Sequence, residues 1–140
     1  WLGDAYLCRG LAYARQGQYH QAIRDYDELI QLEGEHHPKS LYLVAAHNNR
    51  GWAYAGLRQY ALAIRDYTIA IDKTVAREVP RWALAIALPS YLGRNLAYVE
   101  LGAYSLAAED SEEFRRLLLE QRSPDGSTVA FIDCHYRGPT

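Results

Sequence analysis

The segment RGLAYARQGQYHQAIRDY at residues 9–26 occurs again 41 positions later as RGWAYAGLRQYALAIRDY at residues 50–67. Twelve of the aligned positions are identical, which chance does not produce, so the chain contains an internal repeat. A further shift of 44 gives a weaker third copy, which keeps Arg94, Leu96-Ala97-Tyr98, Tyr104, Ala107 and Asp110. Repeats of this length predict stacked units that share one continuous core.

The apolar residues within each copy are spaced as on one face of a helix. In the first copy this face consists of Tyr19, Ala22, Ile23, Tyr26 and Ile30, at relative positions i, i+3, i+4, i+7 and i+11. The second copy has the same spacing in Tyr60, Ala63, Ile64, Tyr67 and Ile71. Strict alternation of apolar and polar residues is absent, so the pattern predicts helices and not strands.

A short break divides each copy into two helical stretches, at residues 16–18, 57–59 and 101–103. The first and third breaks contain Gly17 and Gly102. Glycine can end a helix in the left-handed conformation without steric cost. Each copy is therefore predicted to be a helical hairpin, and the fold class is all-α.

Small residues recur where two helices would have to approach closely. Gly10 and Gly51 occupy the same place in two copies, and so do Ala22 and Ala63. A glycine inside a helix costs about 1 kcal/mol relative to alanine. Its recurrence predicts that a neighbouring helix needs the space.

The order of these residues resembles the signature of the tetratricopeptide-repeat family. The signature residues stand as Gly10, Tyr13, Ala22 and Tyr26, and again as Gly51, Tyr54, Ala63 and Tyr67. In the third copy Asn95 replaces the glycine and Ser111 replaces the aromatic residue. The resemblance implies a right-handed superhelical stack of three helix-turn-helix hairpins. Because the shifts exceed the usual 34 residues of the family, the helices are expected to be lengthened.

We expect a three-repeat domain over residues 1–121 and a non-repeat tail over residues 122–140. The repeats would cover about residues 4–37, 38–79 and 80–121. The first helix of the second repeat is expected to begin near Pro38 or Ser40. Pro80 is expected to start a helical extension that Pro89 kinks or interrupts, and residues 128–132 of the tail read as a strand.

The charge and hydropathy of the 140-residue chain do not favour nucleic acid or a membrane. The formal net charge is −2 and the arginines are scattered, whereas proteins that bind nucleic acid usually carry a basic stripe. The longest apolar runs, such as Trp82–Leu88, are much shorter than the roughly 20 residues of a membrane span. We therefore expect no nucleic-acid partner, no membrane insertion and a cytoplasmic location. The chain starts at Trp1 and contains no methionine, which indicates processing or a piece of a longer polypeptide.

The residues that could carry catalysis do not form a recognisable site. The five histidines match no metal-ligand spacing, and the two cysteines, Cys8 and Cys134, form neither a CxxC pair nor a disulfide framework. Asp133-Cys134-His135 contains a nucleophile and a base, but adjacent residues rarely face each other. Aspartates at the same place in every copy, Asp25, Asp66 and Asp110, are expected to make helix-end or salt-bridge contacts. We expect no catalytic residue, no metal and no cofactor, and hence no enzyme.

The resemblance implies that the first helices of the hairpins line a concave groove for a peptide or helix of another protein. Carried over by position, the groove residues are Leu7, Cys8, Leu11 and Arg15, then Asn48, Asn49, Trp52 and Ala55, then Leu92, Leu96, Val99 and Glu100. Asn49 matches the asparagine with which many members of the family bind a peptide backbone. Trp52 is the expected anchor, and the alternative is that it packs as core.

One branch of the family binds the C-terminal carboxylates of chaperones through a clamp of Lys, Arg and Asn. Here Leu7, Leu11, Pro89 and Gly93 stand at the other clamp positions, and only Asn49 fits. The groove is therefore expected to be apolar with an asparagine rim, and to hold a peptide or an amphipathic helix. Two alternatives stay open: the tail could occupy the groove or pair with a second copy in a homodimer, or the chain could be an accessory or regulatory domain of a larger enzyme.

Overall fold

A computed structural model describes residues 2–75 and 87–120. These residues form six helices. In chain order they are α1 (Leu2–Arg15), α2 (Tyr19–His36), α3 (Leu41–Gly56), α4 (Tyr60–Val75), α6 (Leu88–Glu100) and α7 (Tyr104–Glu120). The helical extension predicted from Pro80 and the tail with its strand-like residues 128–132 lie outside the described residues.

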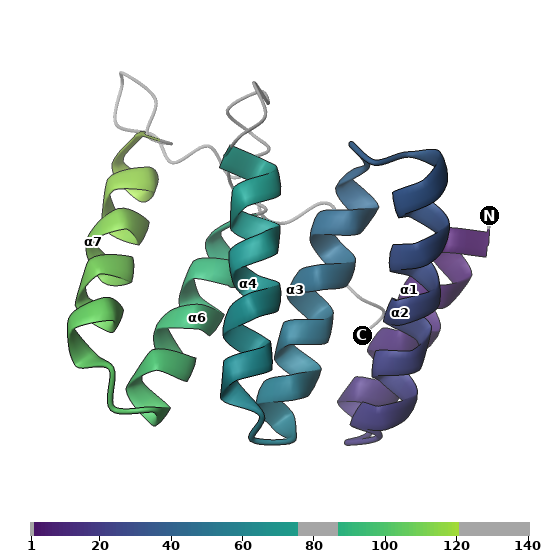
Figure 1. Cartoon of the computed structure of the whole chain (residues 1–140), viewed down its shortest axis with the longest axis horizontal. Helices are drawn as coiled ribbons and strands as arrows, with labels where there is room; N and C mark the ends of the chain where they lie inside the picture. Colours follow the sequence, from purple (N-terminus) through teal and green to yellow (C-terminus); the bar gives the residue numbers. More distant parts are fainter. Residues whose placement is uncertain (1, 76–86, 121–140) are drawn as a thin grey trace.

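The helices follow one another along the stack in chain order, from α1 and α2, which overlap at the right of the view, to α7 at the left (Figure 1). The stack consists of three hairpins, α1 with α2, α3 with α4, and α6 with α7. The three hairpin turns lie at the lower edge in Figure 1, and the connection from α2 to α3 lies at the upper edge. Neighbouring hairpins pack through α2 against α3 and α4 against α6. The prediction of an all-α stack of hairpins is confirmed.

The three hairpin turns have the same backbone conformation. Gly17 and Gly102 have φ angles of 75° and 74°, as their glycine character predicts, and Arg58 at the equivalent position has a φ of 59°. In each turn the residue that follows donates its N–H to a carbonyl five residues earlier; Gln59 donates to Tyr54 over 2.9 Å. The turn geometry therefore belongs to the repeat and does not depend on glycine alone.

Two helix starts can be compared with the sequence. The N-cap of α3 is Ser40, whose Oγ accepts a hydrogen bond of 3.1 Å from the N–H of Tyr42. The start expected near Pro38 or Ser40 is therefore confirmed. The helix expected to follow Pro89 begins slightly earlier, because α6 begins at Leu88 and holds Pro89 in its first turn; the extension that Pro89 was expected to kink or interrupt lies outside the described residues. A first-turn residue needs no N–H partner inside the helix, so proline is tolerated there.

The small residues of the repeat receive aromatic rings, as predicted. A Cβ on Gly10 would lie 2.6 Å from Cε1 of Tyr26, and one on Gly51 would lie 3.0 Å from Cε1 of Tyr67. The first distance is shorter than real side chains tolerate, and the second would force the ring of Tyr67 to shift, so glycine suits this packing in both hairpins. Ala22 and Ala63 are fully buried in the same hairpins.

The third hairpin replaces this glycine–tyrosine contact with hydrogen bonds. Asn95 and Ser111 stand where the other copies have glycine and tyrosine. The Nδ2 of Asn95 donates to Ser111 Oγ at 2.8 Å and also to the carbonyl of Ala107. The two departures from the repeat therefore compensate each other.

An arginine of the first helix pairs with an aspartate of the second in every hairpin. The pairs are Arg9 with Asp25 at 2.7 Å, Arg50 with Asp66 at 2.8 Å, and Arg94 with Asp110 at 2.7 Å. Each guanidinium donates two hydrogen bonds to its carboxylate, from Nε and from Nη2. The expected salt-bridge contacts of the recurring aspartates are confirmed.

The environment of Asp66 shows how these pairs tolerate burial. Burial by itself raises the pKa of Asp66, but hydrogen bonds from Arg50 and from His47 at 3.1 Å outweigh it, so the pKa lies below its ordinary value. The ionised carboxylate is therefore favoured inside the hairpin.

Several side chains connect one hairpin to the next. The Nη1 of Arg50 reaches back to Asp27 of α2 at 2.7 Å, and the Nη1 of Arg94 donates to Thr68 of α4 at 3.0 Å. The ring of Tyr67 lies against both Gly51 of its own hairpin and Gly93 of the next. Gly93 therefore serves packing between repeats.

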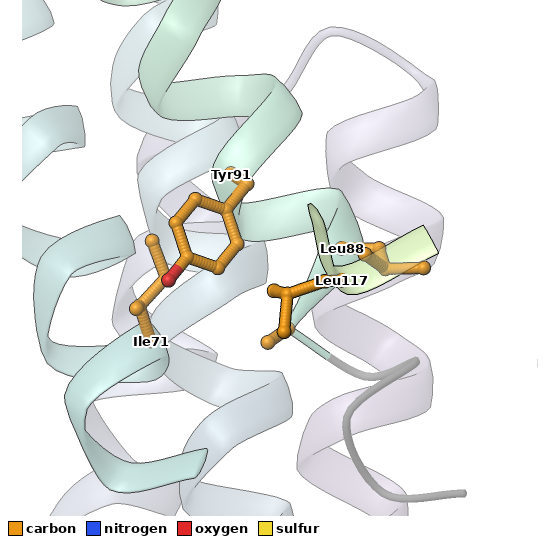
Figure 2. Packing of buried hydrophobic residues seen from close by; sticks show 5 residues of the cluster. Ile71, Leu88, Tyr91 and Leu117 are labelled. Atoms are coloured by element: carbon orange, nitrogen blue, oxygen red, sulfur yellow. The ribbon is translucent and has the colours of Figure 1, made fainter. Parts of the chain in front are cut away.

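The last two hairpins also share an apolar core. Ile71 of α4, Leu88 and Tyr91 of α6, and Leu117 of α7 form one buried cluster with Ala87 (Figure 2). The ring of Tyr91 lies between Ile71 of α4 and Leu117 of α7 (Figure 2). This burial holds α4, α6 and α7 together. As far as the chain is described, none of its helices has the length and apolarity needed to cross a membrane.

Candidate functional site

The first helices of the second and third hairpins carry apolar side chains on a face that is not packed. Trp52 is 48% exposed, and on α6 Leu92, Leu96 and Val99 are 53%, 57% and 42% exposed. We call these four residues the apolar strip. Leu92, Leu96 and Val99 follow at i, i+4 and i+7, so they share one face of α6.

The repeat register places the two halves of the apolar strip next to each other. Leu96 is the equivalent of Trp52, 44 positions later, and Leu92 is the equivalent of Asn48. The helices that carry them, α3 and α6, are in contact. Equivalent positions on neighbouring helices of a stack point in the same direction. The apolar strip therefore continues from α3 onto α6.

The first hairpin contributes less apolar surface to this face. Leu7 and Leu11, the α1 equivalents of Asn48 and Trp52, are half-buried. Leu7 packs against the core cluster that includes Ala14 and Tyr26. Cys8, at the equivalent of Asn49, and Arg15 at the end of α1 are exposed.

Trp52 is both held in place and accessible. Its ring stands edge-on to Tyr19, the first residue of α2, with 6.0 Å between the centroids and 77° between the planes. The same tyrosine ring lies against Gly56 of α3. Because about half of its side chain stays exposed, Trp52 presents a fixed aromatic surface as the α3 part of the apolar strip.

A chain of polar contacts joins α3 to the start of α6. Ser90 donates its hydroxyl to Oδ1 of Asn48 at 2.8 Å, and Asn48 donates its Nδ2 to Oδ1 of Asn49 at 3.4 Å. Asn48 is half-buried, and Asn49 is 6% exposed. Asn48 therefore fixes the spacing of the two helices that carry the apolar strip.

Asn49 has an unused donor. Its buried Nδ2 donates no hydrogen bond in the described part of the chain. Its equivalent in the third hairpin is Gly93, which packs on Tyr67, so position 49 lies at a contact between repeats. A buried amide without a partner is uncommon and destabilising, typically by about 1–3 kcal/mol.

The apolar strip offers hydrophobic contact surface. The apolar strip contains no ionisable side chain, and residues 2–75 and 87–120 hold no group of three His, Cys, Asp or Glu side chains that could bind a metal ion. The sequence did not single out Ser90 or Tyr19 for this face. Ser90 follows a proline at a helix start, and Tyr19 was identified only as a member of the core face of α2.

Comparison with known families agrees with the repeat. The family model of the tetratricopeptide repeat matches residues 3–36, which span α1 and α2. Neither the curated proteins nor the solved structures contain a match to this chain. The first hairpin is therefore similar to a tetratricopeptide repeat, and two further hairpins of the same design follow it.

Proposed function

We propose that this chain is a protein–protein interaction module that holds a peptide or an amphipathic helix of a partner in a concave groove. The groove would be formed by the first helices of the hairpins and would be anchored on the apolar strip. Repeats of this family generally mediate contacts between proteins. In this proposal the chain binds a protein partner, needs no cofactor and catalyses no reaction.

The exposure of the apolar strip is the observation that carries the proposal. Four large side chains at equivalent or successive positions of α3 and α6 remain in contact with water. Contiguous exposed apolar surface of this kind commonly marks an interaction site. An amphipathic helix would bury its own apolar face against it, with anchors at i, i+3, i+4 and i+7.

Trp52 and Asn49 would contribute to binding in different ways. Tryptophan is enriched among the residues that dominate binding free energy, and the contact with Tyr19 limits the motion of Trp52. Asn49 has a donor without an acceptor, and a partner carbonyl would satisfy it only if the buried side chain turned toward the groove. The apolar strip would therefore supply most of the affinity.

The proposal is tested by comparing which proteins different variants retain from an extract of the source cells. Trp52→Ala and Leu96→Ser remove parts of the apolar strip, whereas Leu62→Ser is a matched control, because Leu62 is 41% exposed on a second helix, α4. We expect the parent chain and Leu62→Ser to retain the same partner. The two strip variants should retain about tenfold less of it, or even smaller amounts, with unchanged circular dichroism. Equal retention by all four proteins would contradict the groove.

A further inference from the structure

A second recessed site shares no residue with the apolar strip and lies where α2 ends and α3 begins. This connection is at the edge of the stack opposite the hairpin turns (Figure 1). The cavity has a volume of about 580 Å³ and is lined by Glu33, His37, Pro38, Lys39, Ser40 and Tyr42. Its size falls in the range of cavities that hold small ligands.

The wall of this cavity contains a buried carboxyl group that accepts no hydrogen bond at one of its oxygens. Glu33 is 1% exposed, and its Oε1 has no hydrogen-bond partner among residues 2–75 and 87–120. The imidazole Nδ1 of His37 lies 3.8 Å from Oε1, within ion-pair distance if His37 is protonated but beyond hydrogen-bond distance. Burying a carboxyl oxygen that accepts no hydrogen bond is costly, so a donor that reached this oxygen would be stabilising.

The repeat itself supplies a comparison for this position. The equivalent of Glu33 in the second hairpin is Thr74, 41 positions later. Thr74 is also fully buried, but its hydroxyl donates to the carbonyl of Ala70 at 2.9 Å. Its hydrogen-bonding group is therefore satisfied within α4. The packing of the repeat therefore does not require a carboxyl group here, and Glu33 is a feature of this cavity alone.

The surroundings of Glu33 favour a positively charged ligand with an aliphatic stem. The hydroxyl of Tyr42 donates a hydrogen bond to Asp4 of α1. The hydrogen bond to Asp4, burial, and the negative charges of Asp4 and Glu33 all raise the pKa of Tyr42. The ring of Tyr42 and Pro38 provide apolar wall beside the carboxyl group. Lys39, which is exposed, lines the same cavity and brings a second cation to it.

We propose that this cavity binds a primary ammonium group on an aliphatic chain, with Glu33 as its charge partner and Tyr42 and Pro38 against its methylene groups. A primary ammonium brings three donors and no acceptor, so it can satisfy Oε1 of Glu33. A bare metal ion fits less well, because the described residues offer no group of three metal-ligating side chains. The chemistry is shared by a lysine side chain of a partner protein and by a free aliphatic diamine. This site does not depend on the groove.

Nuclear magnetic resonance titration of the ¹⁵N-labelled chain tests the site with two probes, Nα-acetyl-lysine methylamide and 1,5-diaminopentane. We expect saturable shifts that cluster at residues 33–42 with one probe or both. Tighter binding of the lysine derivative identifies a protein lysine as the source, and tighter binding of the diamine identifies a free amine. The Nε-acetylated lysine derivative, sodium chloride at equal ionic strength and sodium acetate should produce no such cluster.

Three variants separate Glu33 from general electrostatics. Glu33→Gln keeps the shape of the side chain and should weaken binding about tenfold or more. Glu33→Thr introduces the residue of the second hairpin and serves if the glutamine variant does not fold. Glu35→Gln removes the same charge from an exposed position of α2 and should leave binding unchanged.

The proposal is overturned if neither probe gives saturable shifts at residues 33–42, or if the shifts lie on the apolar strip instead. Equal loss of binding in Glu35→Gln and Glu33→Gln would also overturn it, and so would equal binding of the neutral or anionic controls. A Lys39→Gln variant that binds where the parent chain does not would show that Lys39 occupies the cavity, and would exclude an external ligand. If the groove proposal were wrong, the partner-retention experiment would show it, and the result of this titration would stay the same.

Discussion

The hairpin turns show how one residue can depart from the repeat while the backbone keeps its shape. Gly17, Arg58 and Gly102 occupy the same position, and all three have positive φ angles. For an L-residue with a side chain, this conformation costs roughly 1–2 kcal/mol, because Cβ approaches a carbonyl oxygen. Arg58 is held there by the same hydrogen bonds that close the other two turns. The turn therefore stores strain at Arg58.

Arg58→Gly should increase the free energy of unfolding by about 1 kcal/mol, because the relief of strain exceeds the added flexibility of the unfolded chain. Urea unfolding followed by circular dichroism measures the change. Gly17→Ala is the reciprocal variant and should lower stability by a similar amount. A less stable Arg58→Gly variant would show that the arginine side chain contributes contacts that outweigh the strain.

Residue types predicted some of these local features and could not predict others. Gly17 and Gly102 were expected to be left-handed, but nothing about an arginine suggests a positive φ, and only the repeat alignment reveals it. The recurring aspartates predicted ion pairs, since a residue that recurs in every copy is expected to make the same contact within each hairpin. The free donor of Asn49 and the burial of Glu33 were not predictable, because both depend on which neighbouring helix covers them.

At the scale of the hairpin, the third repeat exchanges one kind of interhelical contact for another. The first two hairpins place a tyrosine ring on a glycine, whereas the third joins Asn95 to Ser111 by a hydrogen bond. The smaller serine leaves a cavity of about 280 Å³ lined in part by Tyr91, Asn95, Ser111 and Phe114. The two residues of each pair therefore have to change together.

A double-mutant cycle on Asn95→Gly and Ser111→Tyr tests this dependence. Asn95→Gly alone loses two hydrogen bonds and should destabilise the chain, and Ser111→Tyr alone should clash with the asparagine side chain. Together they recreate the contact of the other hairpins and fill the cavity. We expect a favourable coupling free energy of about 1–2 kcal/mol from thermal or urea unfolding. If the changes in the free energy of unfolding of the two single variants simply added in the double variant, the two positions would not depend on each other.

The elements themselves were largely readable from the sequence. Apolar periodicity and the breaks at glycine gave the hairpins, and Ser40 marked the start of α3. Pro89 marked the neighbourhood of a helix start but not its exact position, because a proline also fits the first turn of α6. Gly93 was considered only as a groove position, and its role against Tyr67 required the packing of α4 on α6.

At the scale of the molecule, contacts between hairpins fix the relative position of the two halves of the apolar strip. Arg50 with Asp27 and Tyr67 with Gly93 bind each hairpin to the next, and Asn48 with Ser90 joins α3 to α6. A stack built of such nearest-neighbour contacts presents equivalent helix positions as one surface. The sequence could predict which residues are equivalent, but exposure separated Trp52 and Leu96 from the half-buried Leu7 and Leu11.

The central claim, that a protein partner binds on the first-helix face of the stack, is tested most directly by photo-crosslinking. A benzophenone-bearing amino acid replaces Leu96 in the apolar strip or Leu62 on α4, both of which are exposed. After irradiation in an extract of the source cells, we predict a defined cross-linked protein from position 96 and none from position 62. Cross-linking of the same protein from position 62 alone, or equally from both positions, would contradict the account.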